Sequence, residues 1–126
     1  MDEFLSTSIL ADIRGHIGYA PDEVDPEFDK QIIDHINTSI ARLAQLGLGK
    51  LGDFLVRTGE ETWNDYLGED YQYIYSFAKD FIQLTAKLKF DPPQGGVLKA
   101  ALDEQLATAE FNVMTAIEEH NIDKEE

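Results

Sequence analysis

The stretch that decides the fold is DYQYIYSFAKDFIQLTAKLKFDPP, residues Asp70 to Pro93. Its apolar residues recur mostly three or four positions apart, with charged and polar residues between them, which is the spacing of a helix that faces a hydrophobic core. Asp70 stands where an N-cap accepts a hydrogen bond from a free backbone N–H. Pro92 and Pro93 end the pattern because neither has an N–H to donate. The stretch therefore predicts a central core helix.

Two amphipathic helices are expected before the central one. A short helix follows Ser8 and has isoleucines and a leucine on one face. A longer helix is capped by Asp29, carries an apolar stripe from Ile32 to Leu46, and ends at Gly47, which supplies positive φ at low steric cost. The acidic segment from residue 18 to 28 lies between them, and its like charges predict an exposed, flexible loop.

A fourth helix is expected after the central one, from about Val97 to about Asn121, with a frayed acidic tail from about residue 118. Its predicted apolar face consists of Leu98, Leu102, Leu106, Ala109, Val113 and Ile117. The fold class is thus all-α, a single small four-helix bundle-like domain spanning residues 1–126. The residues expected in its core are Ile36, Ile40, Leu43, Phe77, Phe81, Leu84, Leu102 and Leu106.

A long loop separates the second helix from the central one, and contains KLGDFLVRTGEE, Lys50 to Glu61. The run from Phe54 to Val56 suits either a short β-hairpin arm or an irregular binding loop, and both remain open here. Thr62 can cap a brief helical turn that holds Trp63. We expect the tryptophan ring to pin the loop to the bundle, because it gains most by packing.

Charge and composition exclude several function classes. The chain has 25 acidic and 10 basic side chains, a net charge of −15, so duplex DNA is a poor partner. It has no cysteine, which excludes disulfides and thiolate metal sites. No apolar run approaches the roughly 20 residues of a membrane span, so we expect a soluble protein without a membrane partner.

No motif in the chain supports catalysis or cofactor binding. GLGK at Gly47 to Lys50 lacks the earlier glycine and the following Ser or Thr of a phosphate loop. The acidic loop lacks the glycine and the final glutamate of a calcium loop. The three histidines lie on separate segments, and no serine sits in a nucleophile elbow. We therefore expect no enzyme activity, no cofactor and no metal.

Three motifs together resemble one known family, in their order and spacing as well as their letters. They are HINTSIARLAQLGLG at His35 to Gly49, TWNDYLG at Thr62 to Gly68, and LKFDPP at Leu88 to Pro93. The chain is similar to the head–tail connector, or adaptor, proteins of tailed phages. That resemblance implies a small all-helical protein that forms a ring beneath the portal of a filled capsid, and it brings no catalytic residues.

The resemblance also implies partners and a place. We expect the chain to bind the portal protein, further copies of itself in a ring of twelve, and a stopper or tail-completion protein. It would lie at the head–tail junction of the virion, after assembly in the host cytoplasm, and the isolated chain can be monomeric. DNA would pass through the channel without specific binding, since acidic walls repel phosphates.

Two other classes stay open as alternatives. An acidic helical inhibitor that mimics DNA would bind a basic partner with steep salt dependence. A small helical ligand-binding protein is the other, although the sequence offers no site for a ligand.

Candidate contact residues for a subunit or portal interface come from the long loop, the aromatic residues between Trp63 and Tyr75, and the last helix. They are Phe54, Val56, Trp63, Tyr71, Tyr75, Phe111, Met114 and Ile117. We also expect the segment from Ile117 to the end to protrude past the bundle, so that its removal would leave folding nearly unchanged.

Overall fold

The computed structural model describes residues 3–17, 26–49, 52–90 and 94–125. These residues form five α-helices and two 3-10 helices, and no strand occurs among them. The all-α prediction is confirmed. In chain order the elements are η1 (Glu3–Ser6), α1 (Ile9–Ile17), α2 (Pro26–Leu46), α3 (Trp63–Leu67), η2 (Gln72–Ile74), α4 (Tyr75–Phe90) and α5 (Gly96–Glu125).

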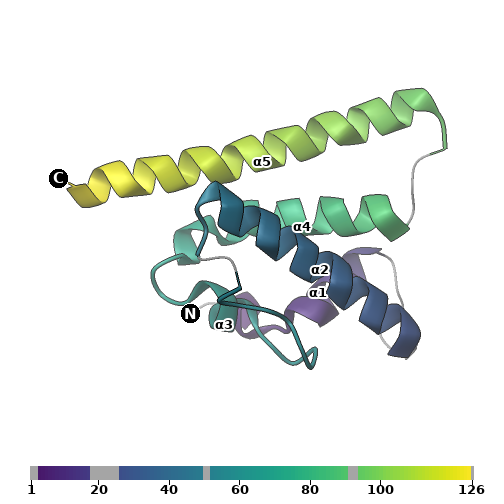
Figure 1. The fold of residues 1–126 in the computed structure, drawn as a ribbon, viewed down its shortest axis with the longest axis horizontal. Coiled ribbons are helices and arrows are strands. Elements are labelled where there is room, and N and C mark those ends of the chain that lie inside the picture. Colours follow the sequence, from purple (N-terminus) through teal and green to yellow (C-terminus); the bar gives the residue numbers. More distant parts are fainter. Residues whose placement is uncertain (1–2, 18–25, 50–51, 91–93, 126) are drawn as a thin grey trace.

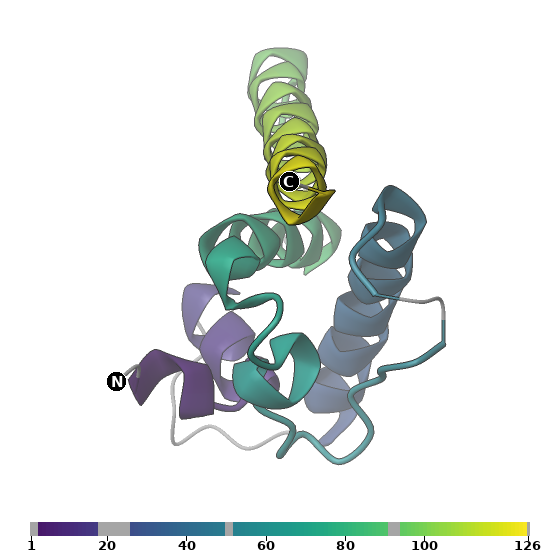
Figure 2. The same ribbon diagram turned by 90° about the vertical axis from the view of Figure 1, so that its left-hand side faces the viewer.

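Helix α4 is the centre of the arrangement, as the apolar spacing predicts. It packs against α1 and α2 on one side and against α5 on the other. Viewed end-on, α5 lies over α4 and approaches α2 only near the C-terminal end of α2 (Figure 2). The helix starts later than predicted, because the 3-10 turn Gln72–Ile74 precedes it and Asp70 is not its cap.

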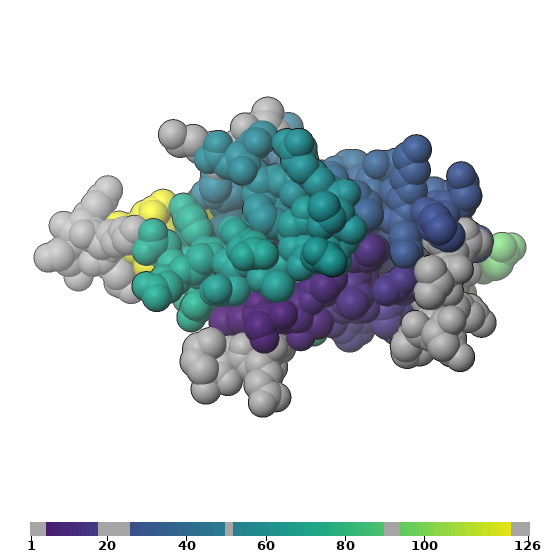
Figure 3. All heavy atoms as spheres, turned by 90° about the horizontal axis from the view of Figure 1, so that it is seen from below, coloured from purple at the N-terminus to yellow at the C-terminus, as the bar shows by residue number. Residues whose placement is uncertain are grey.

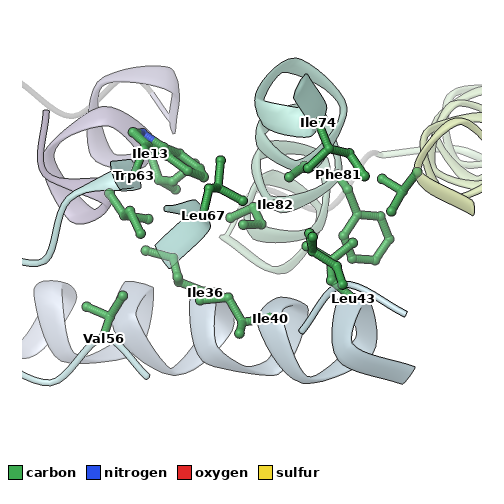
Figure 4. Close-up of a cluster of buried hydrophobic side chains, with 14 of the residues drawn as sticks. Ile13, Ile36, Ile40, Leu43, Val56, Trp63, Leu67, Ile74, Phe81 and Ile82 are labelled. Atoms are coloured by element: carbon green, nitrogen blue, oxygen red, sulfur yellow. The ribbon is translucent and has the colours of Figure 1, made fainter. Parts of the chain in front are cut away.

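The core lies between α1, α2, α3 and α4 (Figure 4). Ile36 and Leu43 of α2 face Ile82 of α4, and Trp63 closes the end of the cluster beside Ile13. All five side chains are fully buried. The helical stripes read from the sequence therefore meet in one continuous core.

Helix α5 is covered over a different part than expected. Its buried residues are Ala109, Val113 and Ile117, whereas Leu102 and Leu106 are only half-buried. The buried residues lie where α5 has the most neighbouring elements, because this part of the helix contacts α4, η2 and α2. A hollow of about 590 Å³ separates the N-terminal half from α4.

Predictions for the core are confirmed for α2 and partly wrong for α4. Ile36, Ile40, Leu43 and Phe81 are buried, but Phe77 is 37% exposed. Leu84 borders the hollow between α4 and α5 and is half-buried for that reason.

The ends of two helices also differ from the prediction. Helix α2 begins at Pro26, not after Asp29, because proline at the first helical position has its φ already set. The predicted loop at 18–28 therefore becomes helix from residue 26, and residues 18–25 lie outside the described part. Helix α5 continues to Glu125, so the backbone from about residue 118 is helical where fraying was expected.

The loop between α2 and α3 has no strand in its described residues, 47–49 and 52–62. Of the two alternatives for Phe54 to Val56, the described backbone gives the irregular loop. An isolated antiparallel bridge joins Ser8 to Thr62 instead. Gly47, which follows the last residue of α2, has the expected positive φ, at +114°.

Candidate assembly surfaces

The long loop is fixed to the bundle by one side chain of α2. Asn37 Nδ2 donates to the carbonyl oxygen of Val56 at 2.9 Å, and the N–H of Val56 donates to Asn37 Oδ1 at 2.8 Å. The amide thus satisfies both backbone groups of Val56, as a neighbouring strand would. This pairing holds the Val56 side chain in the core, where it is 1% exposed.

The far end of the loop is tied to the N-terminus of the chain. Ser8 Oγ donates to the carbonyl oxygen of Gly59 at 2.7 Å, and the N–H of Ile9 donates to that of Glu61 at 2.9 Å. Gly59 has φ +91°, and a Cβ there would lie 2.7 Å from the Leu10 side chain. Only glycine fits this position without a shift.

The Glu61 carboxylate organises the turn before α3. It accepts hydrogen bonds from the backbone N–H groups of Arg57, Thr58 and Gly59, at 2.8, 3.1 and 2.9 Å. Partial burial alone would raise the pKa of Glu61, but the backbone hydrogen bonds outweigh it and lower the pKa to about 2. The carboxylate is therefore a structural anion.

Trp63 begins α3 and links this helix to α1. The side chain of Thr62 accepts from the N–H of Asp65, and the Asp65 side chain accepts from the N–H of Thr62, which forms a capping box. Trp63 itself is fully buried and its Nε1 donates to Asp12 Oδ2 at 2.8 Å. This is the predicted pin, with α1 as its anchor.

Lys79 of α4 completes the same polar cluster. Its Nζ lies 3.2 Å from Asp12 Oδ2 and 3.3 Å from the Tyr75 hydroxyl. Burial alone would lower the pKa of Lys79, but the hydrogen bonds to Tyr75 and Asp12 raise it above its ordinary value. The cluster is a satisfied charge network that holds α1, α3 and α4 together.

A pocket of about 440 Å³ opens between the C-terminal half of α2, loop residues 52–55 and the segment from α3 to residue 71. Ile40, Ala44, Leu48 and Leu67 give it an apolar lining. Phe54 and Tyr66 add aromatic surface to the lining, and their rings stack with centroids 5.0 Å apart. The pocket is therefore large enough for one or two side chains of a partner.

The opening of this pocket is acidic. Asp53, Asp65, Glu69 and Asp70 are exposed among its lining residues, and no Lys, Arg or His is found among the described ones. The Tyr66 hydroxyl is buried in the lining without a hydrogen-bond partner among the described residues. Burial raises the pKa of Tyr66, so the hydroxyl keeps its proton and can still donate.

A second exposed apolar surface among the described residues lies along α5. Val97 is 85% exposed, Leu98 59%, Phe111 64% and Met114 40%. Seen from below, α1, α3 and the loop form one continuous face with α2, and the green N-terminal end of α5 projects beyond it (Figure 3). A helix with so much uncovered apolar surface is suited to contact a partner.

The eight predicted contact residues fall into three groups. Val56, Trp63 and Ile117 are buried in the chain's own core and present no surface to a partner. Phe54, Tyr71 and Tyr75 are half-buried, and the Tyr75 ring packs edge-to-face on Trp63 with centroids 5.4 Å apart. Phe111 and Met114 are exposed on α5.

Two features of the site escaped the sequence reasoning. The pocket with its acidic opening could not be read from spacing, because its lining comes from three segments. Val97 and Leu98 were expected to begin a core-facing helix; their exposure follows from the divergence of α5 from α4.

The described part of the chain contains no group of three His, Asp or Glu side chains placed to hold a metal ion. The His120 ring stacks on the Tyr73 ring, with centroids 4.1 Å apart. Burial lowers the pKa of His35, and the nearby positive charge of Lys89 lowers it further. Within the described residues, no helix is both long and apolar enough to cross a membrane.

Comparison with known proteins matches the chain to a protein family. Residues 9–120 fit the model of a family described as phage connector protein, which takes in α1 to α4 and most of α5. No curated protein and no solved structure matches the chain.

Proposed function

Because the chain belongs to the phage connector protein family, we propose that it is a head–tail connector subunit that forms a ring beneath the portal. The observation that carries this proposal is the family match over residues 9–120, which spans the helical domain almost from end to end. In this role the ring extends the DNA channel and joins the capsid to the tail. Its place is the head–tail junction of the virion.

The partners follow from that position. The ring binds the portal above, neighbouring copies at its sides, and a stopper or tail-completion protein below, with twelve subunits to match the portal. Exposed apolar residues on α5 and the pocket beside α3 offer surface for such contacts. Phe111 and Met114 are the predicted contact residues that are exposed, and the half-buried Phe54 and Tyr71 line the pocket.

The net charge of −15 suits a channel that DNA must cross without sticking. Phosphate binding needs Lys and Arg to replace counterions, and acidic walls repel the backbone instead. A catalytic role is not part of this proposal, and its chemistry is that of assembly.

Co-sedimentation with the purified portal of the same phage tests the proposal. We expect the chain to move with the portal as a ring in analytical ultracentrifugation, over a range of salt concentrations. Free monomer under every condition would contradict a connector role. Tight capture of a basic DNA-binding protein, lost steeply with salt, would favour a DNA mimic instead.

A further inference from the structure

We propose that the N-terminal tip of α5, Gly96 to Lys99, inserts into the pocket beside α3 of a neighbouring copy. This contact rests on the proposed ring and gives it a subunit interface. The tip carries Val97, the most exposed large hydrophobic side chain of the described chain at 85%, and beside it Leu98 at 59%. The pocket is the apolar hollow of about 440 Å³ lined by α2, the loop and α3.

The two surfaces complement each other in polarity. Val97 and Leu98 are aliphatic, and the pocket lining presents Ile40, Ala44 and Leu67. Burying such side chains is favourable roughly in proportion to the apolar area removed from water. A pocket of this volume has room for both side chains of the tip.

They also complement each other in charge. The tip carries Lys99, whose side chain is 68% exposed and forms an ion pair of 3.1 Å with Asp103 one turn along α5. It follows the end of α4, where Lys87 and Lys89 are exposed. The pocket opening carries exposed Asp53, Glu69 and Asp70, which have no ion-pair partner among the described residues. In a chain of net charge −15, a local meeting of cations with carboxylates is what allows copies to approach.

Free backbone donors on the tip add to this match. The first hydrogen bond of α5 runs from the N–H of Lys99 to the carbonyl oxygen of Gly95 at 3.1 Å. The N–H groups of Gly96, Val97 and Leu98 precede it and have no partner within the helix, and Gly95 has no side chain to cap them. Carboxylates at the pocket opening are suitable acceptors at this positive helix end.

The geometry makes the contact head-to-tail. The tip of α5 lies at one end of the molecule, while α3 and the C-terminal half of α2 lie toward the other (Figure 1). One copy therefore cannot fill its own pocket. A contact between two different surfaces of successive copies produces a ring when the rotation closes.

Cysteine pairing tests the contact, because the chain has no cysteine of its own. Leu98→Cys and Ala44→Cys are made in separate chains, mixed, and oxidised both with and without the portal. We expect a disulfide-linked dimer in the mixture that exceeds those of either chain alone. A chain carrying both substitutions should give a ladder of covalent multiples.

Ala107→Cys is the matched control, since Ala107 is an exposed residue of α5 that lies outside the tip and outside the candidate contact residues. A mixture of Ala107→Cys with Ala44→Cys should stay at background. Equal yields from the two mixtures, or linkage of Ala44→Cys to the portal, would overturn the proposed contact.

Unmodified chain is scored in parallel for sedimentation with the portal. Rings that form on the portal without the Leu98–Ala44 link refute this contact and leave the connector role intact. Absence of any portal binding refutes the connector role. In that case the oxidised mixture of Leu98→Cys and Ala44→Cys without portal still decides the contact: a linked dimer supports it, and the absence of a dimer refutes it.

Discussion

Single side chains do more to place the long loop than any repeating pattern. Asn37 lies 19 residues before Val56 and replaces a missing strand partner for it. The Glu61 carboxylate accepts hydrogen bonds from three backbone N–H groups of the turn just before it, those of residues 57 to 59. In the described part of this loop, such bonds satisfy backbone groups and offset the free-energy cost of removing them from water.

Asn37→Ala should release the loop from α2. Two hydrogen bonds are lost and both backbone groups of Val56 are left without their partner, which should cost roughly 1–3 kcal/mol of unfolding free energy. Urea unfolding followed by circular dichroism measures the loss. Thr38→Ala is the matched control, because its hydroxyl bonds only to its own helix at Asp34. Equal stability of the two variants would show that the amide does not hold the loop.

Glu61→Gln should remove a contribution to the unfolding free energy that is present at neutral pH and lost in acid. In the unfolded chain Glu61 takes up its proton near the ordinary pKa of 4.5, but in the folded chain only near pH 2. The folded carboxylate therefore stabilises fully above pH 4.5, and the effect is lost as the pH falls from 4.5 through 2.

We thus expect the wild type to melt at a higher temperature than Glu61→Gln at pH 7, with the difference closing below pH 4.5. Thermal melts across this range check it. The substitution Glu60→Gln at the exposed neighbour removes the same charge but none of the hydrogen bonds to Arg57, Thr58 and Gly59, so it should melt close to the wild type at pH 7. A difference between wild type and Glu61→Gln that is constant with pH would argue against the hydrogen-bonded carboxylate.

Among the helices, α5 has two different halves, because neighbouring elements of the same chain cover only its C-terminal half. Its C-terminal half is a core helix, where Ile117 lies beside Gly47 at the end of α2; a Cβ on Gly47 would be 3.4 Å from the Ile117 side chain. Its N-terminal half is a surface helix with exposed Val97 and Leu98. The expectation that residues after Ala116 contribute little to folding is therefore wrong, since Ile117 is 6% exposed.

Ile117→Ala and Leu98→Ala should separate these roles. Ile117→Ala removes buried methyl groups and should lower the unfolding free energy by roughly 2–5 kcal/mol. Leu98→Ala changes an exposed side chain and should stay within about 0.5 kcal/mol. Denaturant melts of both variants provide the comparison. Similar losses at the two positions would mean that the N-terminal half of α5 is packed as well.

The whole chain acts through its charge and its order of helices. At −15 it should leave duplex DNA unbound even at low salt, where electrostatic attraction is strongest. Gel mobility of a DNA fragment at rising protein concentration checks this expectation. Retarded DNA at low salt that is released as salt increases would speak against a channel wall of this composition.

The sequence by itself determined the all-α class, the central helix, the capped turn at Thr62 and the burial of Trp63. Helical spacing and capping are local, so neighbouring residues suffice to show them. The resemblance carried by three short motifs was likewise present in the letters, and the match over residues 9–120 confirms it.

Only the tertiary structure decided which half of α5 is covered, where Val56 goes, and that a pocket with an acidic opening exists. Spacing shows which face of a helix is apolar, but not how many neighbours lie against each of its turns. The bond from Asn37 to Val56 and the pocket walls join segments far apart in sequence, and their meeting depends on the packing of the whole chain.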